Sequence, residues 1–261
     1  MSPLLIAHRG ASHAAPENTL RAFRLALAER AGGLELDVRL SADGEPVIFH
    51  DAELDRLTAH SGPIAARPWA ELSQLQIHHP SLERAGEGGG LDTTNTVPID
   101  LRLPHLAELL PLLSAHPEPL QLNVELKPTA TPQRLVAATR PHLERLAAEP
   151  HLELVLSSFD PRVLALFASQ PLVAPHRLAL LFEDPNALSA LRFLPTVDLH
   201  PHASLLTPET LAAWSAPGRR FRAWTVDDPT EARRLRALDP DIALITNRPG
   251  PLKAELAPCP P

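Results

Sequence analysis

Residues 33–51, GLELDVRLSADGEPVIFHD, hold two apolar runs that carry chemically reactive side chains. The first run alternates, so Glu35 and Asp37 share one face of a strand while leucine and valine occupy the other. Two carboxylates at this spacing repel each other unless a cation lies between them. The second run delivers His50 after a connection too short for a parallel crossover, which needs about a dozen residues. We therefore predict an antiparallel hairpin that brings His50 back over the carboxylates. Its strands are expected at residues 38–41 and 46–49.

The segment before this stretch has a similar organisation. A short apolar run at residues 3–8 ends in His8, and Arg9 and a glycine follow it. Residues 16–31 have the apolar spacing of a helix that begins at a proline and ends at two glycines. We expect the Glu17-Asn18 pair to cap this helix and to brace the loop that carries His8 and Arg9.

From residue 103 onward, strand patterns alternate regularly with helical patterns. Together with the segments above, they make eight strands and eight helices, and no Gly-rich nucleotide-binding motif follows the first strand. Repeated units of this kind predict an α/β fold of the (β/α)8 TIM-barrel type, with residues 1–261 forming one domain. The strands are expected at residues 3–8, 33–38, 120–126, 152–157, 177–182, 196–200, 221–225 and 242–245. The helices are expected at residues 16–31, 104–115, 131–148, 160–169, 184–192, 207–215, 228–238 and 249–256.

Residues 51–103 fit this alternation worst. They contain a Gly-Pro pair, a short helical pattern at residues 68–75 and a glycine-rich stretch at residues 83–96. We expect residues 51–103 to form a small insertion or lid after the His50 hairpin. The role of the glycine-rich loop stays open.

The composition limits the class of protein. The net charge of −7 argues against binding to nucleic acid or to anionic membranes. The one cysteine, Cys259, excludes a disulfide or a thiolate metal site within a single chain. No signal-peptide or membrane-span pattern is seen, so we expect a cytoplasmic protein without stable membrane insertion.

Polar side chains recur at the carboxyl ends of the predicted strands, where TIM barrels place active-site residues. Glu125 and Lys127 stand at the end of the strand at 120–126, with the same spacing as Glu35 and Asp37. Each carboxylate on its own could be a surface charge or half of a strand-end ion pair. Together, Glu35, Asp37 and Glu125 make an oxygen-only set that suits Mg²⁺ or Ca²⁺, with Mn²⁺ as a further candidate, better than Zn²⁺.

The chain carries a series of short motifs in this order: HRG at 8–10, PENT at 16–19, ELDV at 35–38, DG at 43–44, HD at 50–51, NVELKP at 123–128, SFDP at 157–160, WTV at 224–226 and TNRP at 246–249. These motifs resemble those of the glycerophosphodiester phosphodiesterase family. The resemblance implies a divalent-metal site at the three carboxylates and hydrolysis of glycerophosphodiesters to sn-glycerol 3-phosphate and an alcohol. Glycerophosphocholine and glycerophosphoethanolamine are examples of such substrates. The resemblance also implies attack by the adjacent glycerol hydroxyl, which gives a cyclic phosphate that water then opens.

Phosphodiester cleavage needs neutralised phosphate oxygens, a base and an acid. Arg9 offers a planar fork and Lys127 a point charge for the phosphate. His8 and His50 are the candidate acid and base, because a histidine can titrate near neutral pH. Which one is the acid and which the base cannot be read from the sequence. Asp51 is expected to orient His50 or to cap a turn.

Two further residues stand at predicted strand ends. Trp224 could form an apolar wall against the glycerol carbons, or it could belong to the core. His200 could reach the substrate. We include both as candidate substrate-binding residues.

Three other functions compete with this interpretation. A lysophospholipase D-like phosphodiesterase acting on lysolipids would need an apolar channel or a membrane-facing surface, and residues 51–103 are not strongly apolar. An amidohydrolase would have His-x-His on the first strand, which residues 8–10 lack. A non-catalytic phospho-ligand binder would have lost a histidine or a carboxylate of the set. We therefore predict an enzyme with a small-molecule glycerophosphodiester substrate and no nucleic-acid partner; its head group, metal and oligomeric state stay open.

Overall fold

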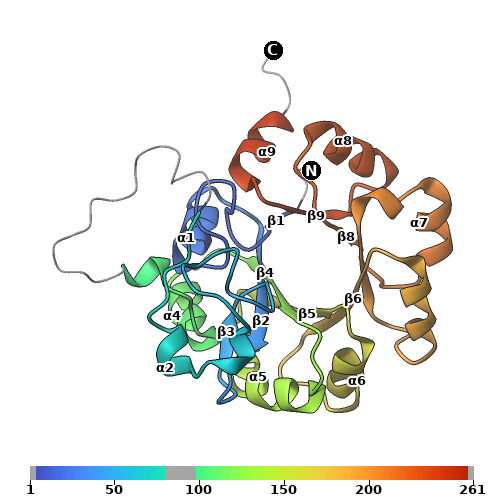
Figure 1. Ribbon diagram of the computed structural model, residues 1–261. Coiled ribbons are helices and arrows are strands. Elements are labelled where there is room, and N and C mark those ends of the chain that lie inside the picture. Colours follow the sequence, from blue (N-terminus) through green and yellow to red (C-terminus); the bar gives the residue numbers. More distant parts are fainter. Residues whose placement is uncertain (1–3, 80–97, 258–261) are drawn as a thin grey trace.

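The computed structural model describes residues 4–79 and 98–257, and their strands form a barrel of eight parallel strands (Figure 1). The strand order is β7-β6-β5-β4-β2-β1-β9-β8. The two ends of this order meet through the bridges Leu199–Phe221 and His202–Trp224, which close the barrel. The predicted (β/α)8 TIM barrel is therefore confirmed. The strands are β1 (Leu5–Ala7), β2 (Gly33–Leu40), β4 (Leu120–Leu126), β5 (Leu152–Ser158), β6 (Arg177–Phe182), β7 (Asp198–Pro201), β8 (Arg222–Ala223) and β9 (Ala243–Thr246).

Helices surround the barrel in Figure 1, and most begin close to where the sequence predicts them. The first begins later, at Leu20, because Asn18 has a left-handed φ of 57° and Thr19 accepts the capping hydrogen bond from the Ala22 N–H. The helix expected at 184–192 is a 3₁₀ helix, η4 (Pro185–Arg192). The others are α1 (Leu20–Ala28), η3 (Leu106–Glu108), α4 (Leu109–Ser114), α5 (Pro132–Ala147), α6 (Pro161–Ser169), α7 (Pro208–Trp214), α8 (Pro229–Leu238) and α9 (Pro249–Glu255).

The hairpin that carries His50 is confirmed. β3 (Pro46–Ile48) pairs antiparallel with the end of β2, with Val38 opposite Ile48 and Leu40 opposite Pro46. β3 pairs with no strand of the barrel other than β2. The peptide N–H of Phe49 donates to the Asp37 carbonyl, which places His50 beside the carboxyl-terminal half of β2.

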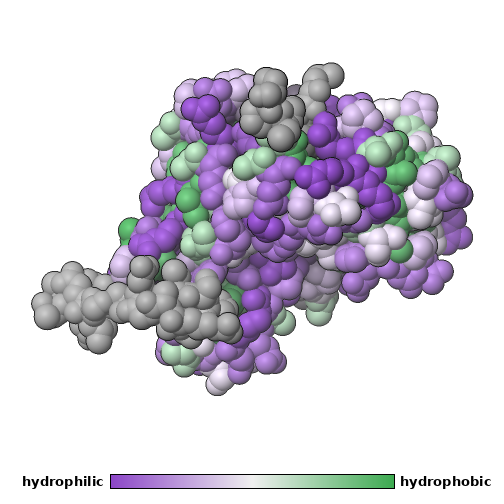
Figure 2. Space-filling model, turned by 90° about the horizontal axis from the view of Figure 1, so that it is seen from above, coloured by the Kyte–Doolittle hydropathy of each residue, from purple (hydrophilic) through white to green (hydrophobic). Residues whose placement is uncertain are grey.

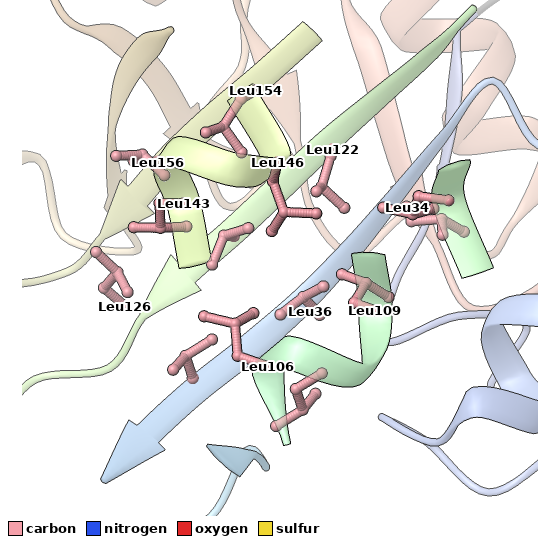
Figure 3. Packing of buried hydrophobic residues seen from close by; sticks show 14 of the residues in the cluster. Leu34, Leu36, Leu106, Leu109, Leu122, Leu126, Leu143, Leu146, Leu154 and Leu156 are labelled. Atoms are coloured by element: carbon pink, nitrogen blue, oxygen red, sulfur yellow. The ribbon is translucent and has the colours of Figure 1, made fainter. Parts of the chain in front are cut away.

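Alternation along β2, β4 and β5 separates the hydrophobic layer from the barrel interior. Leucines such as Leu36, Leu122 and Leu156 belong to a buried cluster that also includes residues of α4 and α5 (Figure 3). The side chains between them, such as Glu35 and Asn123, therefore point to the opposite face, into the barrel. Period-two alternation thus directs the polar residues of these strands to the barrel axis.

Residues 51–79 and 98–103 lie beside β3 and include η1 (Ile64–Ala66), α2 (Trp69–Leu72) and η2 (Ile99–Leu101). They form their own small apolar cluster with β3, which includes Phe49, Leu54 and Leu72. The glycine-rich loop expected at residues 83–96 lies outside the described residues. Within the described part, no helix is long and apolar enough to span a membrane. On the face in Figure 2, hydrophobic residues lie in small groups between hydrophilic ones.

Candidate active site

The loop after β1 turns sharply at Arg9, whose φ of 58° lies in the left-handed region that non-glycine residues rarely adopt. This turn directs the Arg9 N–H to Glu35 Oε2 at 2.9 Å. The next residue, Gly10, approaches α1 so closely that a Cβ there would lie 2.6 Å from the carbonyl carbon of Ala22. The HRG motif therefore encodes a tight turn as well as two functional side chains.

Three buried carboxylates meet at the carboxyl-terminal ends of β2 and β4. Asp37 and Glu125 are opposite each other in the parallel register, and Glu35 lies two residues earlier on β2, on the same face of the strand. One oxygen of each carboxylate lies within 4.8 Å of the others. The exposed fractions are 3% for Glu35, 1% for Asp37 and 6% for Glu125, so bulk water does not screen their repulsion.

Two cations face the carboxylates. Lys127 Nζ lies 2.6 Å from Glu125 Oε1 and 3.1 Å from Asp37 Oδ1. Arg9 Nε lies 3.3 Å from Asp37 Oδ2. We call these five residues, Glu35, Asp37, Glu125, Arg9 and Lys127, the mouth cluster.

The carboxylates of the mouth cluster have divergent proton affinities. Burial would raise the pKa of Asp37, but Lys127 and Arg9 offset it and lower this pKa strongly. Burial and the neighbouring Asp37 raise the pKa of Glu125 to about 7. Burial, Asp37 and Glu125 raise the pKa of Glu35 well above its usual range. Two cations therefore do not neutralise the site, because the third carboxylate is left without compensation.

The donor set of the mouth cluster fits a divalent cation. Asp37 Oδ1 is buried without a hydrogen-bond partner, although Lys127 lies at ion-pair distance. An added cation would lie between carboxylates that otherwise repel each other. Three carboxylate oxygens suit a hard ion, so Glu35, Asp37 and Glu125 could hold a metal.

His50 is held by a network that extends to the loop after β1. Its Nδ1 lies 2.6 Å from Asp51 Oδ1, as expected from the sequence. Asp51 also accepts from Arg56 Nε at 2.6 Å, and Arg56 donates to both oxygens of Glu17. Glu17 in turn accepts from Arg9 Nη1 at 2.7 Å. Glu17 thus braces the site rather than capping α1, and Arg56, to which the sequence analysis gave no role, joins the two histidine-bearing loops.

His8 lies on the other side of this loop, against the end of β9. Its Nδ1 is 2.8 Å from Asn247 Oδ1, and Asn247 Nδ2 donates to Asp227 Oδ2 at 2.6 Å. Burial and the nearby Arg9 lower the pKa of His8 to about 4. Sequence reasoning missed this partnership, although WTVDD at 224–228 and TN at 246–247 both follow strand ends. Burial also lowers the pKa of His50; Asp37 and Asp51 oppose this effect, and Lys127 and Arg9 add to it.

The two further candidates for substrate binding, Trp224 and His200, have different surroundings. Trp224 is half-buried, packs edge-on against Phe159 and His202, and donates from its indole N–H to the His200 carbonyl at 2.7 Å. The His200 side chain is fully buried, with Nε2 3.2 Å from Arg222 Nη1. The structure therefore does not bring His200 together with the mouth cluster.

The His200 side chain belongs to a second polar group, which starts at the amino-terminal ends of the strands. Asp198 accepts from Arg177 and from Arg222 Nη1, and Arg222 Nε donates to Gln121 Oε1 at 2.6 Å. We call this group, Gln121, Arg177, Asp198, His200 and Arg222, the floor cluster. Burial and Arg222 lower the pKa of His200 well below its usual range, and His200 Nε2 faces the N–H donor Arg222 Nη1.

Comparisons with known proteins agree with this geometry. A model of the glycerophosphoryl diester phosphodiesterase family matches residues 8–251. A protein of Mycobacterium tuberculosis named probable glycerophosphodiester phosphodiesterase 1 is 31% identical, covering 97% of this chain and 92% of its own length. A glycerophosphodiester phosphodiesterase of Caldanaerobacter subterraneus is 30% identical, covering 95% and 96% respectively.

A solved structure is also similar along the whole barrel. It is an Oleispira antarctica phosphodiesterase in complex with the product sn-glycerol-3-phosphate, with a TM-score of 0.80 and 29% identity over 98% of this chain and 97% of that one. A family match of this extent, with relatives covered almost end to end, establishes the family. The chain therefore belongs to the glycerophosphoryl diester phosphodiesterase family, whose members are enzymes that hydrolyse glycerophosphodiesters.

Proposed function

We propose that this protein hydrolyses small glycerophosphodiesters, such as glycerophosphocholine or glycerophosphoethanolamine, to sn-glycerol 3-phosphate and an alcohol, with one divalent cation. The observation that carries the proposal is the mouth cluster: three buried carboxylates and two cations beside two histidines. The Oleispira antarctica relative, which binds sn-glycerol-3-phosphate as its product, supports the same chemistry.

The metal is proposed to bind Glu35, Asp37 and Glu125. Mg²⁺ or Ca²⁺ suits this oxygen set best, and Mn²⁺ is the third candidate. When bound, the ion would offset charge on the phosphoryl oxygens. Arg9 and Lys127 already face the carboxylates, so they are positioned to neutralise the remaining phosphate charge, Arg9 as a planar fork and Lys127 as a point charge.

The acid–base work is proposed for His8 and His50. The glycerol hydroxyl next to the phosphate attacks phosphorus while one histidine takes the hydroxyl proton. The other histidine protonates the leaving oxygen of the alcohol, which gives a cyclic phosphate. Water then opens the ring with the two roles exchanged. Both side chains are part-buried and each binds a partner through Nδ1, so Nε2 is the atom that exchanges protons.

Trp224 is proposed as the apolar wall for the glycerol carbons. The side chain follows β8 and is half-buried, and its two edge-on aromatic neighbours fix its orientation. His200 has no part in this proposal because Arg222 holds it inside the barrel.

The deciding assay is the release of glycerol 3-phosphate from glycerophosphocholine. The protein is measured in EDTA and then with added Mg²⁺, Ca²⁺ or Mn²⁺. Activity that a metal restores would support both the reaction and the carboxylate site. A folded protein that is inactive on glycerophosphocholine but cleaves lysophosphatidylcholine with the same metal would favour the lysolipid alternative.

Single-residue variants test the acid–base assignment. His8→Ala and His50→Ala should each lower turnover by at least ~10², a typical loss for a general acid or base. Metal affinity, measured by calorimetry, should stay close to that of the wild type, because neither histidine belongs to the carboxylate set. Near-normal turnover in either variant would remove that histidine from the mechanism.

A further inference from the structure

The two proposed catalytic histidines are held by chemically different partners. His50 Nδ1 faces the carboxylate of Asp51, whereas His8 Nδ1 faces the amide oxygen of Asn247. A carboxylate stabilises a charged imidazolium, but an amide oxygen only accepts a hydrogen bond. The difference between these partners distinguishes the two rings.

The orientation of the Asn247 amide is fixed by Asp227. The carboxylate of Asp227 accepts from Asn247 Nδ2 at 2.6 Å, from the Asn247 backbone N–H at 2.8 Å and from Thr246 Oγ1 at 2.9 Å. A flipped amide would place its oxygen 2.6 Å from a carboxylate oxygen, so two acceptors would face each other. The amide nitrogen therefore faces Asp227 and the amide oxygen faces His8.

This orientation determines which nitrogen of His8 carries the proton. Asn247 Oδ1 has no proton to donate, so the hydrogen bond of 2.8 Å requires a proton on His8 Nδ1. The lone pair of the neutral ring is then on Nε2. Ser12 Oγ lies 2.9 Å from the same oxygen and 2.8 Å from the His8 carbonyl oxygen, and its single proton can be donated to either acceptor, so it does not oppose this orientation.

We propose that Asp227 is a positioning residue that acts through Asn247 to hold His8 as the Nδ1–H tautomer, so that His8 enters the reaction as a proton acceptor at Nε2. The proposal rests on the proposed function for the identity of the reaction. Asp227 itself does not touch the substrate in this scheme. Arg9, Asp37 and Glu17 are the charged groups that act on His8, and burial and Arg9 keep the ring neutral at pH 7.

The tautomer can be measured without turnover. In ¹⁵N-histidine-labelled protein with Mg²⁺ present, two-bond ¹H–¹⁵N correlations distinguish a ring protonated at Nδ1 from one protonated at Nε2. The His8 signal is assigned as the one that the His8→Gln variant lacks. The wild type should show the Nδ1–H pattern at pH 7, and an Nε2–H pattern would overturn the proposal.

The variant Asp227→Asn removes the carboxylate that fixes the amide. We expect mixed tautomers at His8 and a fall in kcat of about 10-fold or more, typical of residues that orient a catalytic ligand, with KM unchanged. Thr246→Val is the matched control, since it removes another hydrogen bond to Asp227 but leaves the amide pair intact. It should keep the wild-type tautomer and kcat. A wild-type tautomer and kcat in Asp227→Asn would also overturn the proposal.

The double variant Asp227→Asn/Asn247→Asp moves the carboxylate one link closer to His8 without changing the net charge. It should restore the Nδ1–H pattern, recover most of kcat, and move the acidic limb of the pH profile of kcat/KM upward, because a carboxylate now faces the ring. If Asp227 had only a structural role, the double variant would not recover kcat, and the acidic limb of its pH profile would not move. This variant and the wild-type spectrum also decide the matter if Asp227→Asn alone does not fold.

Failure of the proposed function would look different. A wild-type protein with the Nδ1–H signal but no diesterase activity with any metal would overturn the proposed reaction and support the positioning of His8. An active wild type with the Nε2–H signal would do the reverse.

Discussion

The mouth cluster and the floor cluster both bury charged side chains inside one barrel, yet their charge balance differs. In the floor cluster, Asp198 accepts four hydrogen bonds from three arginine residues: two from Arg177, one from Arg222 and one from the Arg220 backbone N–H. In the mouth cluster, three carboxylates share two cations, and Asp37 Oδ1 has no hydrogen-bond donor. The carboxylate of Asp198 thus has a full set of donors, whereas the carboxylates of the mouth cluster outnumber its cations. The floor atoms that lack a hydrogen-bond partner, His200 Nδ1 and Arg222 Nη2, are nitrogens and not carboxylate oxygens.

This difference separates a structural role from a functional one. The charge of a buried carboxylate with a full set of donors is compensated within the fold, and removing one partner of such an ion pair leaves an unpaired charge. A buried site with excess charge is destabilising unless a ligand compensates it, which is the condition expected at a binding site. Substitutions in the two clusters should therefore have opposite effects on activity and stability.

The largest expected effect is that of Glu125→Gln. Loss of one ligand from the carboxylate set should lower turnover by at least ~10³ and weaken metal binding by at least ~10², measured by glycerol 3-phosphate release and calorimetry. The amide can still accept from Lys127, which lies 2.6 Å from Glu125 Oε1. The metal-free variant should therefore be at least as stable as the metal-free wild type. A destabilised variant that retained turnover would mean that the mouth cluster is structural.

Asp198→Asn should show the reverse behaviour. It leaves Arg222, which is 1% exposed, without its carboxylate, so the free energy of unfolding should fall by about 3–5 kcal/mol in urea titrations. Turnover of the protein that remains folded should stay within about three-fold of the wild type, because Asp198 lies away from the mouth cluster. A stable but inactive Asp198→Asn protein would contradict the division between the clusters.

The metal-free protein should lose stability as the pH rises from 6.5 to 8. Glu125 has a pKa of about 7 in the fold, above that of the unfolded chain, so the folded state binds the extra proton and its advantage disappears on ionisation. The expected loss is about 1 kcal/mol in EDTA. Lowered histidine pKa values act with the opposite sign, but only below about 6.5, the usual histidine value.

Two controls sharpen this pH experiment. Mg²⁺ should remove the slope, because a bound cation offsets the carboxylate charge. Glu125→Gln should reduce the slope in EDTA. Metal-free stability that stays flat or increases over this pH range would show that the carboxylates do not repel each other in the fold.

The sequence predicted the barrel and the mouth cluster because both depend on local patterns. Period-two alternation placed Glu35, Asp37 and Glu125 on one face, and the short connection to β3 required an antiparallel hairpin. Partners distant in the chain were not predictable in this way. Asp227 reaches Asn247 only because β8 and β9 are neighbours, and the distance along the chain gives no sign of it.

The buried position of the His200 side chain was not predictable from the sequence for the same physical reason. A histidine near the end of a strand is compatible with either the mouth or the interior, since one residue of register decides how deep the side chain lies. Here Leu181 is its neighbour on β6, and Arg222 holds the ring inside the barrel. The decisive partner, Arg222, was not among the residues singled out from the sequence because a buried arginine has no signature in an apolar run.

The smallest expected effect is that of His200→Gln. Its amide oxygen can replace Nε2 as the acceptor from Arg222, so the free energy of unfolding should change by no more than about 1 kcal/mol. Turnover and KM should stay within about two-fold of the wild type. His200→Leu, which offers no acceptor, should be less stable by about 1–3 kcal/mol with the same KM. A rise in KM shared by both variants, without loss of stability in His200→Gln, would restore the contact with substrate that the sequence suggested and would connect the floor cluster to the chemistry at the mouth.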